Sequence, residues 1–416
     1  MNKKLNVIAV DLTSFLKGEQ DDWYKSFVLD LLSRLAVLAP QTRFILLTQA
    51  TSHDELSVMD RPNMQRLMVL DRPVEVILER SCLQRFVDRI ILKLRRKLLQ
   101  VMSKLGHQLR FNNAATLLQK INTDLLFCPF TAPTYYETGI ATVCTIYDLQ
   151  YKTYPLFFAI EDVAYRNRIF TEACQRASAL VTISDFTRDS VISHGKLDPA
   201  NIRKIYPYMA RLSELNVDND KPLLASLKLT PERYIIYPAN YSKHKNHEML
   251  ITAFGMACLR GLPTVIKLVC TGVPSERQAF LMSAVRAMKL ADRVIFSGDV
   301  SNIELKTLMV NSIGVVFPSL YEDFCVTVIE AMALGVPVAC SNLTSLPEVA
   351  GNAAILFDPR IPNQISDAIV SLVEDKTLRA QLVQTGYQRV ADFSGSEQMA
   401  RDHWTLFLSA FANVKH

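Results

Sequence analysis

The sequence predicts an α/β protein made of two doubly wound units that face a central cleft. The chain has 416 residues, which suggests two or three domains at about 150 residues each. Short apolar runs alternate with amphipathic stretches in both halves, a rhythm typical of parallel sheets with helices on both faces. A polar stretch at residues 211–231 interrupts the rhythm and predicts a linker. Ligands of such units bind at the carboxyl ends of the strands, near the switch point of the sheet.

Each half of the chain contains its own set of strand and helix patterns. Apolar runs in the first half predict strands at 5–10, 43–48, 68–70, 124–128, 141–147 and 179–183. Helical periodicity there predicts helices at 23–38, 158–176 and 185–194. The second half predicts strands at 234–238, 265–272, 293–298, 314–319, 336–341 and 353–359. Its helices are expected at 247–259, 275–288, 302–311, 326–334 and 361–385.

Positive charge is concentrated in one segment. The net charge is +5, but residues 85–110 hold eight basic residues and one acid, a net +7, so the remainder carries −2. A nucleic-acid binder that relies on a general basic field is therefore excluded. Apolar residues recur through 83–110 opposite a basic stripe, which predicts a cationic amphipathic helix. This helix either lies on an anionic membrane surface or packs on the core with its basic face in solvent.

Cysteine usage and hydropathy indicate the compartment. The eight cysteines are widely spaced and form no Cys-x-x-Cys pair, which favours a reduced, cytosolic protein with buried thiols. No apolar run approaches the roughly 20 residues that span a bilayer. We expect a cytoplasmic protein whose contact with the membrane, if it is peripheral, is made through 83–110.

The most informative segment is PSLYEDFCVTVIEAMALGVPV, residues 318–338. A strand is expected to end at Phe317, a turn to present Glu322 and Asp323, and a helix to begin near Cys325. The free amides at the start of that helix form a ready phosphate site. Glu330 follows Glu322 by eight residues, so both carboxylates are expected to face one ligand.

This segment resembles the Glu-x7-Glu signature of the retaining glycosyltransferases of family 4, the group 1 glycosyltransferases, which have the GT-B fold. The segments SLPEVAG (345–351) and ILFDP (355–359) and the tail around ADFSGSEQMARDHWTLF follow the family pattern in order. The resemblance implies two Rossmann-like domains facing a central cleft. It implies an acceptor-binding domain at 1–210, a nucleotide-sugar-binding domain at 211–395 and a helix at 396–416 that returns to the first domain.

The resemblance also assigns donor contacts within the signature. Glu330 is expected to bind the ribose hydroxyls, and Glu322 to contact the donor sugar near its anomeric carbon. The amides of Val326 and Thr327 are expected to cradle the diphosphate, next to Phe324 and Cys325. The family has Glu-Gly-Phe-Gly where this chain has Glu-Asp-Phe-Cys at residues 322–325. Glycine is favoured there because it permits close approach of the backbone to the sugar or a positive φ. The side chains at 323 and 325 are therefore expected to narrow the pocket or add a polar contact, so the donor sugar is not carried over from the family.

A second loop, YPANYSKHKNHEML (237–250), lies between a predicted strand and helix. Lys245 would supply a positive charge for the diphosphate as negative charge builds on the leaving group. The loop resembles the family's Gly-Arg-x4-Lys-Asn segment, with Asn240 in the position of the arginine. The second positive charge would then come from Lys243 or His244.

On the acceptor side, CTIYDLQYKTYP (144–155) resembles the family's His-Asp segment, with Tyr147 in place of the histidine. Asp148 either orients an acceptor hydroxyl and accepts its proton, or caps the following turn.

The expected activity is retaining transfer of a hexose, from GDP-mannose or a related donor, to a hydroxyl of a glycan or lipid-linked glycan during cell-surface polysaccharide assembly. No metal or cofactor is expected beyond the nucleotide-sugar co-substrate. The alternative is a catalytically degenerate GT-B protein that binds a nucleotide sugar, a lipid or a partner. A nicotinamide-dependent dehydrogenase is disfavoured, because no Gly-x-Gly-x-x-Gly follows a strand.

Overall fold

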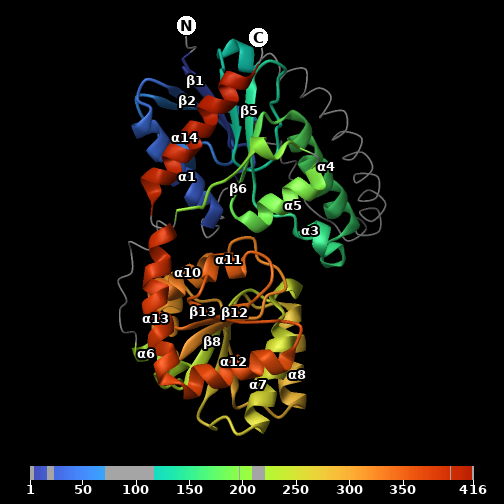
Figure 1. The fold of residues 1–416 in the computed structure, drawn as a ribbon, viewed down its shortest axis with the longest axis vertical. Helices are drawn as coiled ribbons and strands as arrows, with labels where there is room; N and C mark the ends of the chain where they lie inside the picture. The colour runs from blue at the N-terminus through green and yellow to red at the C-terminus, as the bar shows by residue number, and fades with distance from the viewer. Residues whose placement is uncertain are drawn as a thin grey trace, which may run out of the picture.

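The computed structural model describes residues 4–15, 23–70, 117–195, 197–208, 221–393 and 395–414. It contains two parallel sheets, each with its own flanking helices, stacked along the long axis of the molecule (Figure 1). The two-sheet α/β architecture predicted from the alternating pattern is therefore confirmed. The candidate amphipathic helix at 83–110 lies outside the described residues.

The N-terminal sheet has seven parallel strands in the order β3-β2-β1-β4-β5-β6-β7. They are β1 (Val7–Asp11), β2 (Arg43–Gln49), β3 (Met64–Leu70), β4 (Leu125–Cys128), β5 (Ala141–Ile146), β6 (Ala179–Thr182) and β7 (Ile202–Lys204). The helices beside it are α1 (Trp23–Leu38), the short α3 (Gln150–Thr153), α4 (Ile160–Arg176) and α5 (Asp185–Gly195). The central strands are fully buried, as their continuous apolar runs require. The strand order reverses between β1 and β4, which sets the switch point.

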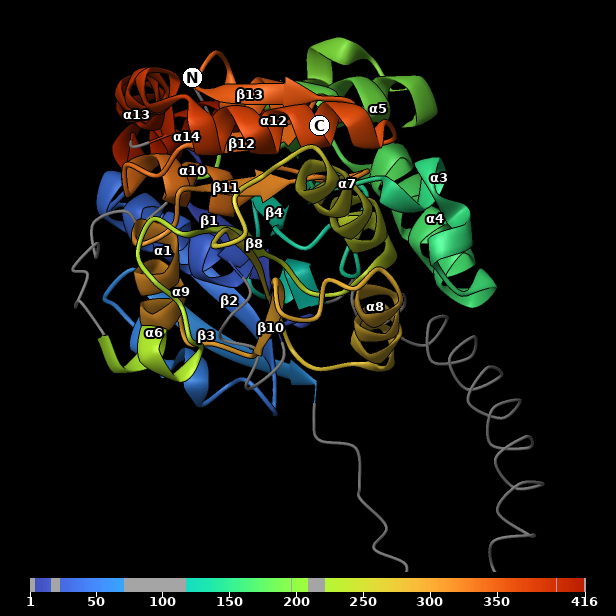
Figure 2. The same cartoon turned by 90° about the horizontal axis from the view of Figure 1, so that it is seen from below.

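The C-terminal sheet has six strands in the order β10-β9-β8-β11-β12-β13. They are β8 (Tyr234–Pro238), β9 (Lys267–Thr271), β10 (Val294–Gly298), β11 (Gly314–Phe317), β12 (Val338–Ser341) and β13 (Ala354–Phe357). Its helices are α6 (Lys221–Ser226), α7 (His247–Leu259), α8 (Glu276–Ala287), α9 (Asn302–Val310), α10 (Val326–Ala333), α11 (Leu346–Ala350), α12 (Pro362–Glu374) and α13 (Lys376–Val390). Helices α7 and α12 lie side by side (Figure 2). The switch point lies between β8 and β11.

Two sequence predictions need correction. The single helix expected at 361–385 is two helices, because Asp375 is extended and its side chain caps α13 by accepting from the Leu378 amide at 2.8 Å. The expected linker at 211–231 is partly structured: residues 221–226 form α6, and Leu224 and Leu229 are buried in the C-terminal core.

The last helix, α14 (Ser396–Asn413), packs on the N-terminal unit. Figure 1 shows the chain leaving α13 in the lower unit and running up beside α1 in the upper one. Phe407 is fully buried, and its ring centroid lies 5.0 Å from that of Phe127 on β4.

Two further findings concern the compartment. Seven cysteines fall within the described residues; all are free thiols, and all but Cys258 are buried. Across the described part of the chain, no helix has both the length and the apolar character needed to span a membrane.

Candidate active site

Two loops of the C-terminal unit meet beside its switch point. Strands β8 and β11 are parallel neighbours, so the loops that follow them leave the same edge of the sheet. The Lys245 Nζ atom on the first loop lies 2.7 Å from Glu322 Oε1 on the second. Both side chains are largely buried, with 19% of Lys245 and 6% of Glu322 exposed. Two charges that lie 77 residues apart in the sequence thus converge.

Buried hydrogen bonds tie these two loops together. The Asn246 side-chain amide donates to the carbonyl oxygens of Pro318, at 3.0 Å, and Pro359, at 2.9 Å. The Tyr237 hydroxyl donates to the Lys245 carbonyl oxygen at 2.8 Å. Asn246 has a φ of 60°, in the left-handed region that asparagine tolerates better than most residues. Lys245 is therefore held on a fixed turn.

Lys245 and His244, which are neighbours on this loop, differ in charge at pH 7. Burial lowers the Lys245 pKa, but the Glu322 carboxylate opposes this effect, and the pKa is raised overall. Burial and the Lys245 charge lower the His244 pKa to about 4. His244 is therefore neutral at pH 7 and does not supply the second positive charge suggested as an alternative by the sequence. Among the described residues, no three His, Cys, Asp or Glu side chains gather into a potential metal site.

Asn240 stabilises its own turn. Its side-chain oxygen accepts the Ser242 amide at 3.1 Å, and the residue is exposed. Lys243, on the same loop, is also exposed. A donor contact by Asn240 stays a prediction, and Lys243 is the remaining candidate for a second charge.

The start of α10 has the backbone conformation that the missing glycine implied. Cys325 precedes the helix with φ 51°, so the expected positive φ is confirmed. A non-glycine residue in this region costs about 1–2 kcal/mol. The Cys325 side chain makes no capping hydrogen bond. It therefore does not occupy the first amides of α10, those of Val326 and Thr327.

Glu330 and Phe324 differ in how far they are buried. Glu330 is half-buried on the second turn of α10, and its predicted contact with ribose stays a prediction. Phe324 is fully buried, with ring centroids of Trp23, Tyr206 and Phe393 at 6.4, 5.7 and 5.5 Å. The Phe324 side chain therefore packs between the two units. A donor contact by Phe324 stays a prediction.

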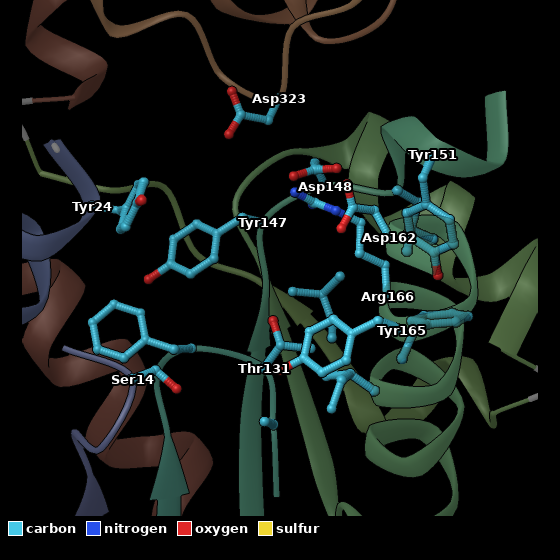
Figure 3. A pocket seen from close by; sticks show the side chains of 16 residues that line it. Ser14, Tyr24, Thr131, Tyr147, Asp148, Tyr151, Asp162, Tyr165, Arg166 and Asp323 are labelled. Atoms are coloured by element: carbon cyan, nitrogen blue, oxygen red, sulfur yellow. The ribbon is translucent and has the colours of Figure 1, made fainter. Parts of the chain in front are cut away.

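A cavity of about 520 Å³ opens where the two units face each other (Figure 3). Its wall is rich in aromatic residues: Tyr24, Phe130, Tyr147, Tyr151, Tyr165 and Phe170. Its charged residues are Asp148, Asp162, Arg166 and Asp323. Among the described lining residues, Asp323 alone comes from the C-terminal unit. The cavity is thus shared between the units, and it lies at the carboxyl end of β5.

Two carboxylates of this cavity, Asp148 and Asp323, each accept a hydrogen bond from a nearby backbone amide. Asp148 Oδ1 accepts the Gln150 amide at 2.9 Å, so the predicted turn-capping contact is present in a residue that also lines the cavity. Asp323 Oδ1 accepts the Phe324 amide at 2.9 Å. Burial, followed by the charges of Asp148 and Glu322, raises the Asp323 pKa to about 7. An acceptor role for Asp148 stays a prediction, and Asp323 was foreseen only as a residue that narrows the pocket or adds a polar contact.

Two phenols of the cavity wall carry unsatisfied hydroxyls. The Tyr147 ring lies 6.0 Å from that of Trp23 and 5.6 Å from that of Tyr24. The hydroxyl groups of Tyr147 and Tyr151 are buried and have no hydrogen-bond partner among the described residues. Buried polar atoms are normally hydrogen-bonded, so a ligand or water is expected to complete these two.

Glu348 on α11 links the two units, a role that sequence reasoning missed. Its carboxylate accepts the amides of Asp185, at 2.8 Å, and Phe186, at 3.2 Å, from the start of α5. The Tyr206 hydroxyl donates to it at 2.8 Å, and Lys204 Nζ lies 3.4 Å away. The sequence placed Glu348 in a family segment, but it carried no signal for these partners.

Part of the C-terminal unit matches a known protein family. Residues 223–389 match the family model described as "Glycosyl transferases group 1". The O-antigen chain mannosyltransferase B of Escherichia coli is 28% identical over 259 residues, which are 61% of this chain and 66% of that protein. The O-antigen chain mannosyltransferase RfbU of Salmonella typhimurium is 26% identical over 216 residues, 52% of this chain and 56% of that protein. The chain thus spans just under two thirds of the first relative, and 26–30% of three Escherichia coli WbdA mannosyltransferases.

Solved structures show the same fold over nearly the whole chain. Sucrose-phosphate synthase from Thermosynechococcus elongatus superposes with a TM-score of 0.69 at 20% identity, covering 98% of this chain and 99% of that one. WaaG, a glycosyltransferase involved in lipopolysaccharide biosynthesis, superposes with a TM-score of 0.61 at 13% identity, covering 95% and 99%. The predicted GT-B fold is confirmed, and the predicted resemblance to the group 1 glycosyltransferases is supported by the match over residues 223–389.

Proposed function

We propose that this protein is a retaining hexosyltransferase that moves mannose from GDP-mannose to a hydroxyl of a glycan or lipid-linked glycan in cell-surface polysaccharide synthesis. The observation that carries the proposal is the buried Lys245–Glu322 pair at the carboxyl ends of β8 and β11. It lies within the region that matches the group 1 family. The choice of mannose is supported by the mannosyltransferase relatives.

The pair supplies both charges that glycosyl transfer needs. Positive charge develops at the anomeric carbon and negative charge on the departing diphosphate, and preorganised opposite charges stabilise both. Lys245 faces the diphosphate, and Glu322 faces the donor sugar. Because the two side chains are paired with each other, donor binding draws the Lys245 cation toward the phosphate oxygens and turns Glu322 toward the sugar.

The start of α10 completes the diphosphate site. The amides of Val326 and Thr327 belong to the first turn, where the helix dipole favours an anion. Glu330 binds the ribose hydroxyls from the second turn. The 1–210 unit holds the acceptor, and the 211–395 unit holds the donor. The reaction takes place on the cytoplasmic side, where sugar nucleotides are available; contact with an anionic membrane through 83–110 would bring a lipid-linked acceptor to the cleft.

The test measures transfer from a panel of GDP and UDP sugars to mannose-terminated glycans, with NMR to assign the anomeric configuration of the product. The Glu322→Gln variant should lose at least about a hundredfold in kcat, because a stabilising charge in the transition state disappears. Glu374→Gln is the matched control, since Glu374 is exposed at the end of α12.

Three outcomes would contradict the proposal in different ways. An inverted product would exclude the retaining mechanism. Unchanged turnover in Glu322→Gln would remove the carboxylate from the reaction. Donor binding without turnover for every sugar nucleotide would favour the degenerate binding protein, an alternative that the replacement of the family arginine by Asn240 keeps open.

A further inference from the structure

Asp323 faces a different part of the cleft from its neighbour Glu322. Glu322 contacts Lys245 on the loop after β8, whereas Asp323 lines the cavity of the N-terminal unit. Figure 3 shows the Asp323 carboxylate projecting from the C-terminal unit toward Tyr147 and Asp148. The Asp323 carbonyl oxygen accepts the Ser184 hydroxyl at 3.2 Å, which anchors the residue across the interface. Two consecutive carboxylates therefore mark the donor side and the acceptor side of one reaction centre.

The charge of the cavity restricts what it can bind. Among the described residues, its lining holds three carboxylates, those of Asp148, Asp162 and Asp323, and one guanidinium, that of Arg166. Like charges at short range repel, so a phosphate or carboxylate placed there is disfavoured. Hydroxyl groups are favoured, because each can donate to a carboxylate oxygen.

The neutral groups of the cavity favour a sugar ring as well. The rings of Tyr24, Tyr147, Tyr151 and Tyr165 line the cavity. An aromatic ring provides an apolar surface against which the C–H groups of a sugar ring can pack. The volume of about 520 Å³ lies within the range of about 300–1,000 Å³ for small-molecule sites.

We propose that this cavity binds the reactive end of an uncharged sugar acceptor, and that Asp323 receives the hydroxyl that attacks the donor. The inference rests on the proposed function, because it places the acceptor against a sugar nucleotide held by the C-terminal unit. Asp323 is suited to this position because Oδ1 is engaged by the Phe324 amide, and Oδ2 has no hydrogen bond from the described residues.

The chemical step balances as follows. The acceptor oxygen forms a bond to the anomeric carbon on the face from which the diphosphate departs, so the anomeric configuration is retained, and the bond between that carbon and the diphosphate oxygen breaks. The electron pair of the broken bond leaves with the nucleoside diphosphate. The hydroxyl proton passes to Asp323 Oδ2 and is later released to solvent.

The ionisation of Asp323 supports this role. Burial raises its pKa to about 7, and Asp148 and Glu322 add to the rise while Lys245 opposes it. Asp162 and Arg166 face the same cavity from α4. A base with a pKa near the operating pH is effective at proton transfer. Because the carboxylate must be ionised to accept a proton, acceptor turnover should fall as the pH drops below about 7.

The first arm of the test measures binding without donor, so it does not depend on catalysis. Isothermal titration compares α-mannobiose with its 6-phosphate. Wild-type protein should bind the neutral sugar at least about tenfold more tightly, and Asp323→Asn should reduce that ratio severalfold, because one repulsive charge is removed. Equal or tighter binding of the phosphate ester by wild-type protein would overturn the proposal, whether or not the protein transfers sugar.

The second arm measures transfer to α-mannobiose and, separately, the binding of GDP by isothermal titration. Asp323→Asn should lower kcat for transfer by about a hundredfold and remove the fall in activity below pH 7. Asp292→Asn, at an exposed position, is the matched control. Weakening of GDP binding in proportion to the loss of transfer, or an unchanged pH profile, would place Asp323 in a donor or structural role and refute the assignment.

Discussion

Replacing Lys245 with methionine should destabilise the C-terminal unit by about 3–5 kcal/mol, because it leaves a buried charge without its partner. In the wild-type protein Lys245 Nζ lies 2.7 Å from a Glu322 carboxylate that is only 6% exposed. That carboxylate has too little contact with water to be resolvated in place. Methionine keeps most of the apolar stem of lysine, so the loss reports mainly on charge.

A double-mutant cycle separates the charge interaction of Lys245 and Glu322 from the packing of their side chains. Glu322→Gln should lower the free energy of unfolding by less, about 1–2 kcal/mol, because Lys245 is 19% exposed and can reach water. The double variant Lys245→Met/Glu322→Gln buries no charge. The double variant should therefore lose about 2–3 kcal/mol less free energy of unfolding than the two single variants lose together.

The assay must follow the C-terminal unit specifically. Trp404 on α14 packs on the N-terminal unit and Trp23 on α1 packs against both units, so tryptophan fluorescence would not isolate the transition of the C-terminal unit. Native-state hydrogen exchange of the β8 and β11 amides measures the required opening free energy. Lys243→Met, on the same loop but exposed, should change it by less than about 0.5 kcal/mol. A similarly small change in Lys245→Met, or additive single losses, would refute the reasoning.

Three further predictions test other parts of the structure. Asn246→Ala should lower the free energy of unfolding by about 3 kcal/mol, because it loses two hydrogen bonds and strains a backbone with φ 60°. Asn246→Gly loses the same hydrogen bonds but adopts this φ without strain, so its loss should be about 1 kcal/mol smaller. Equal losses for the two variants in denaturant titrations would contradict this prediction. Burial lowers the His403 pKa to about 4, so the unfolded chain takes up the proton first and stability falls as the pH drops from 6.5 toward 4. His403→Phe should therefore remove about 2 kcal/mol of the loss measured between pH 7 and 5, and an unchanged pH dependence would count against it. Glu348→Gln should speed hydrogen exchange of the Asp185 and Phe186 amides by about tenfold, and unaltered exchange would show that the contact contributes little.

The sheets could be predicted because each strand is a short apolar run bounded by turn residues. Strands β8 and β11 show this directly: YIIYP and GVVF are buried along their full length. The break between α12 and α13 was missed, because apolar periodicity continues across it and the local cap at Asp375 decides the boundary. Strand β7 was also missed, because three residues are too few to show the apolar run or alternation that predicts a strand.

The donor side of the site could be predicted for a similar reason. Lys245 and Glu322 follow neighbouring strands, so adjacency in the sheet brings them together. The contacts across the interface could not be predicted, because they depend on how two separately formed units are oriented. Glu348 has no local pattern that points to the start of α5, and the burial of Phe324 against Trp23 depends on the same orientation.

Two of the departures from the family pattern, Tyr147 and Asp323, occupy opposite walls of one cavity. Tyr147 replaces the family histidine on the N-terminal wall, and Asp323 replaces a glycine on the C-terminal wall. Burial raises the pKa of the Tyr147 phenol, and the Tyr24 and Asp323 groups add to that rise, so Tyr147 stays protonated and can donate but cannot act as a base. Asp323 restores a titratable group whose pKa is about 7, close to that of a free histidine. Under the proposal for Asp323, the proton-accepting group belongs to the C-terminal unit while the acceptor lies in the cavity of the N-terminal unit. Proton transfer would then depend on the contact between the two units, through which the Asp323 carbonyl oxygen accepts the Ser184 hydroxyl.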